Sequence, residues 1–153
     1  MTDIALKITN VHQDPYAAQR MTSGKFKVNK ELNEEWIDIL NAGPYVLNMQ
    51  GRILACMRRI GSPQQPSRLQ CLKYGLLRAN TTLPLHPGKK IRIYTGEQPR
   101  KSTKIEDHSG ISKVLWAVLG HYLWVPAGNE AHIYFSLQDM KNGNPPLSRY
   151  LIR

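Results

Sequence analysis

Three consecutive residues carry the side chains of a serine-hydrolase triad, but their spacing argues against one. Asp107, His108 and Ser109 follow one another directly. Adjacent side chains diverge, so these groups cannot form a Ser-His-Asp arrangement among themselves. The chain also lacks a Gly-x-Ser-x-Gly nucleophile turn and the glycine-rich loops that cradle phosphates. These patterns predict a protein that is not an enzyme and that uses no cofactor.

A short acidic run is the other place where acid–base chemistry could arise. Glu34, Glu35 and Asp38 lie close together in sequence and could supply paired carboxylates. In a strand, however, Glu35 points to the opposite face from Glu34 and Asp38. We therefore expect a solvated acidic rim here rather than a catalytic pair.

Histidines and cysteines are not spaced as metal ligands. The two cysteines, Cys56 and Cys71, stand fifteen positions apart, whereas a structural zinc site needs four soft ligands in closely spaced pairs. No close metal-ligand spacing links the five histidines, which are His12, His86, His108, His121 and His132. The sequence predicts no metal site and two buried cysteines, with a single disulfide as the alternative in an oxidising compartment.

The basic residues are concentrated in one segment. The chain carries a formal net charge of +10, yet residues 52–104 alone carry +11 and the remainder −1. This segment contains one acid, Glu97, and twelve cations, which are Arg52, Arg58, Arg59, Arg68, Lys73, Arg78, Lys89, Lys90, Arg92, Arg100, Lys101 and Lys104. Such asymmetry is typical of a surface that binds a polyanion or docks on an acidic partner.

Two interpretations of this basic segment stay open. Its cations could contact phosphates while the interleaved Tyr74, Tyr94 and Trp116 stack on bases, as in nucleic-acid-binding proteins. Alternatively, the cations could serve solubility, and the aromatic residues could belong to the core or its rim. Charge and composition do not choose between these alternatives.

Length and hydropathy predict one domain spanning residues 1–153. The chain is 41% hydrophobic, and no stretch approaches the roughly 20 consecutive apolar residues of a membrane-spanning helix. Its first residues lack the charged, apolar and small-residue regions of a signal peptide. We therefore expect a basic protein with no integral membrane segment and a cytoplasmic location.

Short alternating segments predict an all-β fold. Ile37 and Ile39 share one face of a predicted strand, as do Ile91 and Ile93 in another. We expect turns at 41–44 and 86–88 and a polar loop at 61–67. The predicted strand segments are 4–9, 34–40, 45–57, 69–77, 89–95, 131–135 and 147–152. Strands at this spacing favour an antiparallel sandwich or barrel.

One segment has helical periodicity. Ile111, Val114, Leu115, Val118 and Leu119 follow the spacing of one helix face, with Ser109 as an N-cap and Gly120 as a stop. The pattern predicts a short helix near 110–119. A strand is the alternative, because the segment is rich in β-branched residues.

Three segments, read in order, resemble the lamin tail domain family. Residues 32–41 (LNEEWIDILN) are similar to that family's early strand, and residues 83–96 resemble its proline-glycine turn and following strand. Trp124, Gly128 and Asn129 resemble its late Trp-Asn-Asn-x-Gly-Asp signature. Residues 49–52 (MQGR) stand where the family has Leu, a small residue, Gly and Trp. The resemblance spans most of the chain.

This resemblance implies a fold and a class of function. Lamin tail domains are immunoglobulin-like antiparallel β-sandwiches that have been linked to protein partners and to chromatin and DNA. The resemblance therefore implies a non-catalytic interaction or scaffolding module that binds a protein partner. The alternative is a DNA-binding module that uses the 52–104 surface. An isolated edge strand could also support pairing into homo-oligomers.

Overall fold

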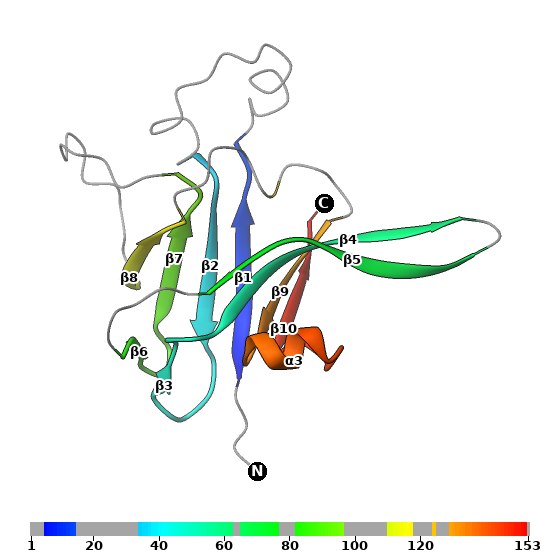
Figure 1. The fold of residues 1–153 in the computed structure, drawn as a ribbon. Coiled ribbons are helices and arrows are strands. Elements are labelled where there is room, and N and C mark those ends of the chain that lie inside the picture. Colours follow the sequence, from blue (N-terminus) through cyan, green and yellow to red (C-terminus); the bar gives the residue numbers. More distant parts are fainter. Residues whose placement is uncertain are drawn as a thin grey trace.

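The computed structural model describes residues 5–14, 34–62, 65–76, 82–96, 110–117, 124 and 129–152. Ten strands and one helix make up this described part (Figure 1). They are β1 (Leu6–His12), β2 (Trp36–Asn41), β3 (Leu47–Asn48), β4 (Ile53–Ser62), β5 (Gln65–Leu76), β6 (Pro84–Leu85), β7 (Lys90–Tyr94), β8 (Ile111–Trp116), β9 (Asn129–Tyr134), α3 (Leu137–Lys141) and β10 (Ser148–Leu151).

The strands form two four-stranded sheets. The first sheet has the order β1-β2-β7-β8 and the second sheet the order β10-β9-β4-β5, while β3 and β6 make a small two-stranded pair. The predicted all-β sandwich is confirmed. One correction concerns strand direction, because β8 runs parallel to β7 whereas the other pairs are antiparallel. A parallel pair needs a connection of a dozen or more residues, and the chain between Tyr94 and Ile111 is that long.

The predicted helix near 110–119 is wrong over the residues that the structure describes. Ile111–Trp116 is strand β8, which pairs with β7 at the edge of the first sheet. Its burial pattern does not alternate cleanly, and its apolar residues Ile111, Val114 and Leu115 happen to have helical spacing. The helix that does form, α3, was not predicted. Ser136 caps it, since its Oγ accepts a hydrogen bond of 3.1 Å from the backbone N–H of Asp139.

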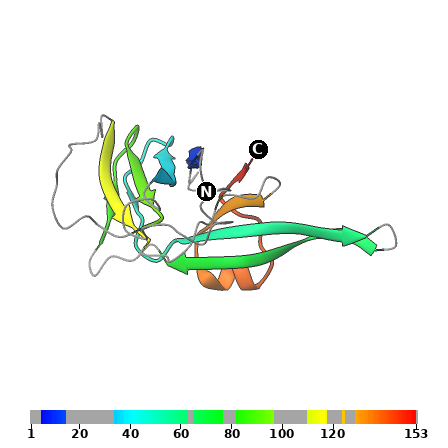
Figure 2. The same cartoon turned by 90° about the horizontal axis from the view of Figure 1, so that it is seen from above.

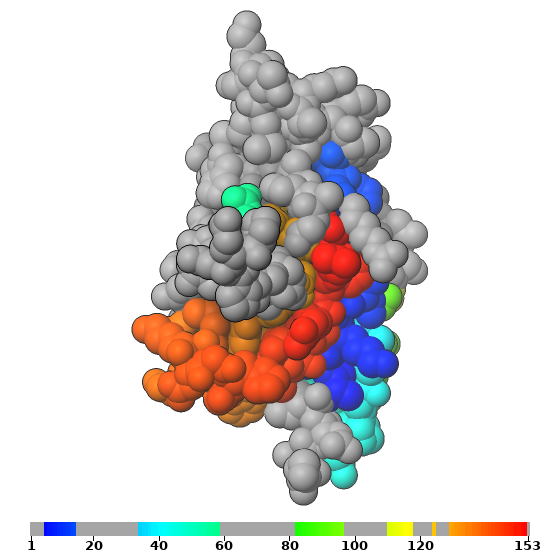
Figure 3. Space-filling model, turned by 90° about the vertical axis from the view of Figure 1, so that its right-hand side faces the viewer, coloured from blue at the N-terminus to red at the C-terminus, as the bar shows by residue number. Residues whose placement is uncertain are grey.

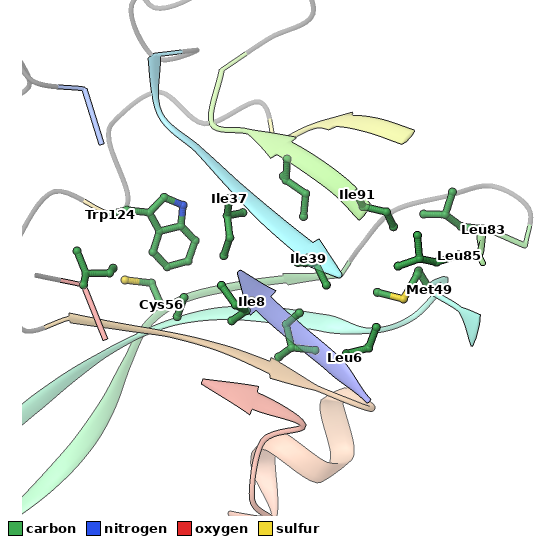
Figure 4. Packing of buried hydrophobic residues seen from close by; sticks show 14 residues of the cluster. Leu6, Ile8, Ile37, Ile39, Met49, Cys56, Leu83, Leu85, Ile91 and Trp124 are labelled. Atoms are coloured by element: carbon green, nitrogen blue, oxygen red, sulfur yellow. The ribbon is translucent and has the colours of Figure 1, made fainter. Parts of the chain in front are cut away.

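The apolar faces of the two sheets enclose the main core. Ile37 lies opposite Ile93 and Ile39 opposite Ile91 in the first sheet, and all four are buried as their alternation predicted. Ala131 and Ile133 of β9 face them from the second sheet within the same cluster. Figure 4 shows that Trp124, Cys56 and Met49 fill the same space. The predicted burial of Cys56 is confirmed, while the side chain of Cys71 lies outside the described residues.

The second sheet is covered on its outer side too. All six residues of β9 are buried. Tyr134 joins Ile53, Ala55 and Met57 of β4 in a second apolar cluster, against which the helix α3 packs through Leu137 and Met140. The edges of the two sheets meet where Ile8 N–H donates to Ser148 Oγ at 3.1 Å. Figure 3 shows the C-terminal segment lying against β1 along this seam.

The turn predicted at 41–44 is confirmed, and its asparagine is central to it. Asn41 is fully buried, and its Oδ1 accepts a hydrogen bond from Gly43 N–H at 3.0 Å. Its Nδ2 donates to the carbonyls of Tyr45 and Leu85, at 2.7 and 2.8 Å. The predicted turn at Gly88 is also confirmed, with a φ of 76° that glycine adopts without steric cost. Asn41 therefore joins the end of β2 to the β3–β6 pair.

The hairpin of β4 and β5 extends far beyond the sheet that contains its base. β9 pairs with β4 only from Ile53 to Arg58, whereas β5 pairs with β4 up to Ser62. Figures 1 and 2 show that the far end of the β4–β5 ribbon projects from the body of the protein. We call these two strands the arm and residues 58–62 and 65–70 its projecting part. Within the projecting part, the structure describes the side chain of Arg58 and, for the other residues, the backbone alone.

The predicted polar loop at 61–67 is therefore wrong at both ends. β4 continues to Ser62 and β5 begins at Gln65, so the connection is much tighter than a loop of this length. Gly61 and Pro66 favour turns, but cross-strand pairing outweighs that preference. Pro66 is tolerated because β5 is an edge strand, where a missing backbone N–H breaks no ladder bond to a further strand.

Replacing Asn41 by alanine tests its role in the fold. The N41A variant loses three side-chain hydrogen bonds, of which the one to the Leu85 carbonyl is buried and the other two are part-buried. We expect the free energy of unfolding to fall by about 2 to 3 kcal/mol, measured by urea denaturation. N144A is the matched control, because Asn144 is exposed and should change stability by less than about 0.5 kcal/mol. Equal effects of the two variants would contradict this role.

Candidate functional site

The three acidic residues of the early strand have different environments. Glu34 is exposed, as expected, but the predicted solvated rim is wrong for the other two. Glu35 is 0% exposed, and its carboxylate accepts hydrogen bonds from Thr95 Oγ1 at 2.7 Å and from the backbone N–H of Trp124 at 3.1 Å. A buried carboxylate needs such donors to offset its desolvation. Glu35 therefore joins β2 and β7 to Trp124 and is inaccessible to a substrate.

Asp38 and Arg92 form an ion pair on the outer face of the first sheet. Arg92 Nε donates to Asp38 Oδ1 at 2.8 Å and its second nitrogen, NH2, to Oδ2 at 3.0 Å. Asp38 is 4% exposed. The hydrogen bond to Asp38 raises the pKa of Arg92 well above its ordinary value, against the opposing effect of burial. The Arg92 guanidinium carbon lies 4.8 Å from the centre of the Trp36 ring, which is cation–π distance.

A row of aromatic rings crosses all four strands of the first sheet. The register places His12 opposite Trp36, Trp36 opposite Tyr94, and Tyr94 opposite Trp116. His12 stacks on Trp36 with ring centres 3.8 Å apart and planes 5° apart. Trp36 meets Tyr94 edge-on at 5.7 Å, and Tyr94 stacks on Trp116 at 4.7 Å. We call these four residues the aromatic row.

The ends of the aromatic row differ from its middle. Tyr94 is buried, whereas His12 and Trp116 are half-buried and lie on the two edge strands of the sheet. Among the described groups, the buried indole N–H of Trp36 has no hydrogen-bond acceptor. Sequence reasoning singled out Tyr94 and Trp116 but missed His12 and Trp36. No local signal could have shown these pairings, because strand register determines them.

Two lysines share this outer face with the aromatic row. Lys7 and Lys90 lie opposite Leu40 from its two neighbouring strands. Lys90 and Tyr94 are four residues apart on β7, which is about 13 Å along a strand. Asp38 is the one acid in these registered rows of described residues, and it is paired with Arg92. The face therefore combines rings with an excess of positive charge.

The structure distributes the twelve predicted polyanion-binding residues over three places. Four belong to the arm, with Arg58 exposed and with Arg59, Arg68 and Lys73 placed by the backbone alone. Lys89, Lys90 and Arg92 lie at the start and along the length of β7. Arg52 precedes β4. The remaining four, Arg78, Arg100, Lys101 and Lys104, lie outside the described residues.

Arg52 is packed against an aromatic ring. Its guanidinium carbon lies 3.9 Å from the centre of the Phe135 ring, and NH1 donates to the Phe135 carbonyl at 2.7 Å. Burial lowers the pKa of Arg52 from its ordinary value. Because these contacts occupy its guanidinium, Arg52 fixes the base of β4 to the end of β9.

The second sheet contains a buried polar chain on β9. His132 is hydrogen-bonded to Tyr134 Oη through Nδ1 at 3.0 Å and to Glu130 Oε1 through Nε2 at 3.2 Å. All three residues are buried. In the described part of the chain, no group of three or more His, Cys, Asp or Glu residues is arranged to hold a metal ion. The residues Asp107, His108, Ser109 and His121 lie outside that part, as does Gly128.

No protein-family model matches the chain, and no curated protein matches it. Within the described residues, no helix is long and apolar enough to cross a membrane. Within the described ranges, the arm and the outer face of the first sheet are the places where several cations lie together.

Removing the Asp38 carboxylate tests the ion pair on the first sheet. In D38N the half-buried Arg92 keeps its charge but loses its charged acceptor. We expect the free energy of unfolding to fall by about 1 to 3 kcal/mol in urea denaturation at pH 7. The control is E34Q, because Glu34 is exposed and its change should stay below about 0.5 kcal/mol. An unchanged stability in D38N would mean that the pair is not needed to hold β2 and β7 together.

Proposed function

We propose that this protein is a non-catalytic module that binds nucleic acid through its β4–β5 arm. The observation that carries the proposal is the arm itself, a two-stranded ribbon that leaves the body of the protein and bears cations without acids. The resemblance to lamin tail domains supports a binding role of this kind, since that family has been linked to DNA as well as to proteins.

The shape of the arm suits a groove of nucleic acid. A two-stranded antiparallel ribbon is narrow enough to enter the major groove of duplex DNA. Beyond Arg58, the described strand β4 pairs with β5 and no longer with β9. In this part of the hairpin, neither strand has a further described strand along its outer edge.

The charge of the arm suits a phosphate backbone. Residues 53–76 include four cations and no acid. In the projecting part, Arg58 lies opposite Gln70, Arg59 opposite Leu69, and Ile60 opposite Arg68. Each cation that neutralises a phosphate releases condensed counterions, which favours binding and makes it sensitive to salt. By strand alternation the positions of Arg58 and Arg68 share one face of the ribbon, whereas that of Arg59 falls on the other face. A ribbon lying in a groove could therefore offer cations to the phosphates on both sides of it.

A protein partner is the second candidate, and a different feature favours it. Tyr45 and Val46 are adjacent in the connection between β2 and β3, where they are 62% and 51% exposed. Exposed neighbouring apolar side chains are typical of contact sites for other proteins. A partner bound there would contact the opposite end of the β2 strand from the aromatic row.

Replacing the three arginines of the projecting part tests the proposal. The variant R58S/R59S/R68S should bind duplex DNA more weakly for every sequence tried. The slope of log K against log salt should become shallower by about 3, because three phosphate contacts are lost. Fluorescence anisotropy of a labelled duplex at several salt concentrations between about 50 and 200 mM measures both quantities.

K89S/K90S is the matched control, because it removes two cations of the same basic segment from the first sheet rather than from the arm. We expect this variant to keep most of the salt slope. Absence of duplex binding by the unaltered protein at about 50 mM salt would overturn the proposal. Recovery of one stoichiometric protein partner that survives nuclease treatment, and that is lost on changing Tyr45 and Val46, would favour the second candidate.

A further inference from the structure

We infer that the outer face of the first sheet is a separate binding site for unpaired nucleic-acid bases, with Trp116 as the residue on which a base stacks. This inference concerns the aromatic row and does not rest on the arm. It goes beyond the proposed function because the ligand is a single strand and the recognising groups are rings rather than arginines.

The geometry of the aromatic row leaves a ring face available at its end. Trp116 stacks on Tyr94 with ring planes 17° apart, so one face of its indole is occupied. β8 is the edge strand of the first sheet, and no described residue places a ring against the other face of Trp116. Trp116 is also half-buried, so part of its surface reaches solvent. A base stacked there would continue a column of rings that the fold already holds in place.

The inner rings of the row make Trp116 a rigid platform. Trp36 is held between His12, which stacks on it, and Arg92, which lies over its ring and is itself fixed by Asp38. Trp36 in turn meets Tyr94 edge-on, and Tyr94 stacks on Trp116. A ring that is already ordered loses little conformational freedom on binding, so more of the stacking energy appears as affinity.

The positive charge of the outer face of the first sheet favours a polyanionic ligand over a neutral one. Aromatic rows can also bind the apolar faces of sugars, but a neutral sugar gains nothing from nearby cations. Lys7 and Lys90 lie on the same face as the row, and Asp38 is neutralised by Arg92. A strand whose base stacks on Trp116 could therefore place its phosphates near these ammonium groups.

Stacking on Trp116 requires a base whose own flat face is uncovered, and this favours unpaired bases as ligands. In a duplex the faces of the bases already stack on their neighbours, whereas in single strands they are available to aromatic side chains. Stacking of this kind tolerates any base, because every base has a π face. We therefore expect affinity for single strands with little sequence preference.

Comparing two oligomers of equal charge tests this inference on the full chain. One is a 12-nucleotide oligothymidylate, and the other is an abasic 12-mer with the same phosphates and no bases. We expect the oligothymidylate to bind about tenfold more tightly, in titrations followed by tryptophan fluorescence and by anisotropy. This comparison needs no variant, so it remains valid if a substitution disturbs folding. Equal affinities would overturn the inference.

Two matched variants locate the effect. W116L keeps an apolar side chain on β8 but removes the ring, so the advantage of the oligothymidylate over the abasic strand should disappear. F135L removes an exposed ring from the second sheet and should keep that advantage. A W116L protein that retains the full advantage would overturn the inference, as would binding of a neutral glucan oligosaccharide without binding of oligothymidylate.

The same variants distinguish this inference from the proposed function. R58S/R59S/R68S should weaken duplex binding while keeping the preference for oligothymidylate over the abasic strand. W116L should keep duplex binding. The unaltered protein could show no binding to duplex DNA and still bind the oligothymidylate more tightly than the abasic strand. That result would contradict the proposal for the arm and support the stacking site on the first sheet.

Discussion

Burial of one apolar face from each sheet is the constraint on which the rest of the structure depends. Isoleucines of β2 and β7 pack against Ala131 and Ile133 of β9, and this contact fixes which face of each strand is left outside. A slip of one residue in any strand would exchange its inner and outer side chains. The packing of the core therefore determines which side chains lie on the outer faces, where we propose that ligands bind. The same alternation that buries Ile37 and Ile93 places Trp36 and Tyr94 on the outer face.

The second sheet uses the same principle to support the arm. β9 holds the base of β4 in the sheet as far as Arg58, and Arg52 fixes the start of that strand to Phe135. Beyond that point β5 is the one described strand that pairs with β4. An edge that is long and unpaired is a liability for a soluble protein unless charge or proline protects it. The arginines and Pro66 meet that need, and the arginines are also the residues that we propose to contact phosphate.

The sequence predicted those features that depend on neighbours along the chain. The burial of Ile37, Ile39 and Ile91 followed from alternation, and the Asn41 turn from side-chain chemistry. Features that depend on pairing between strands distant in the sequence could not be predicted from local patterns. The aromatic row joins His12 to Trp116 through three pairings that no local pattern encodes. The arm was misjudged for a related reason, since Gly61 and Pro66 suggest a loop until their strands are paired. Glu35 was misplaced because its donors, Thr95 and Trp124, come from remote segments.

The proposed contact between the arm and nucleic acid can be observed residue by residue. The most direct test follows the backbone amide signals of the ¹⁵N-labelled protein by NMR during titration with a short duplex. We expect the largest chemical-shift changes in residues 58–62 and 65–70, with the main core unchanged. Changes confined to residues 42–46, or spread evenly over the surface while the arm stays unperturbed, would contradict it.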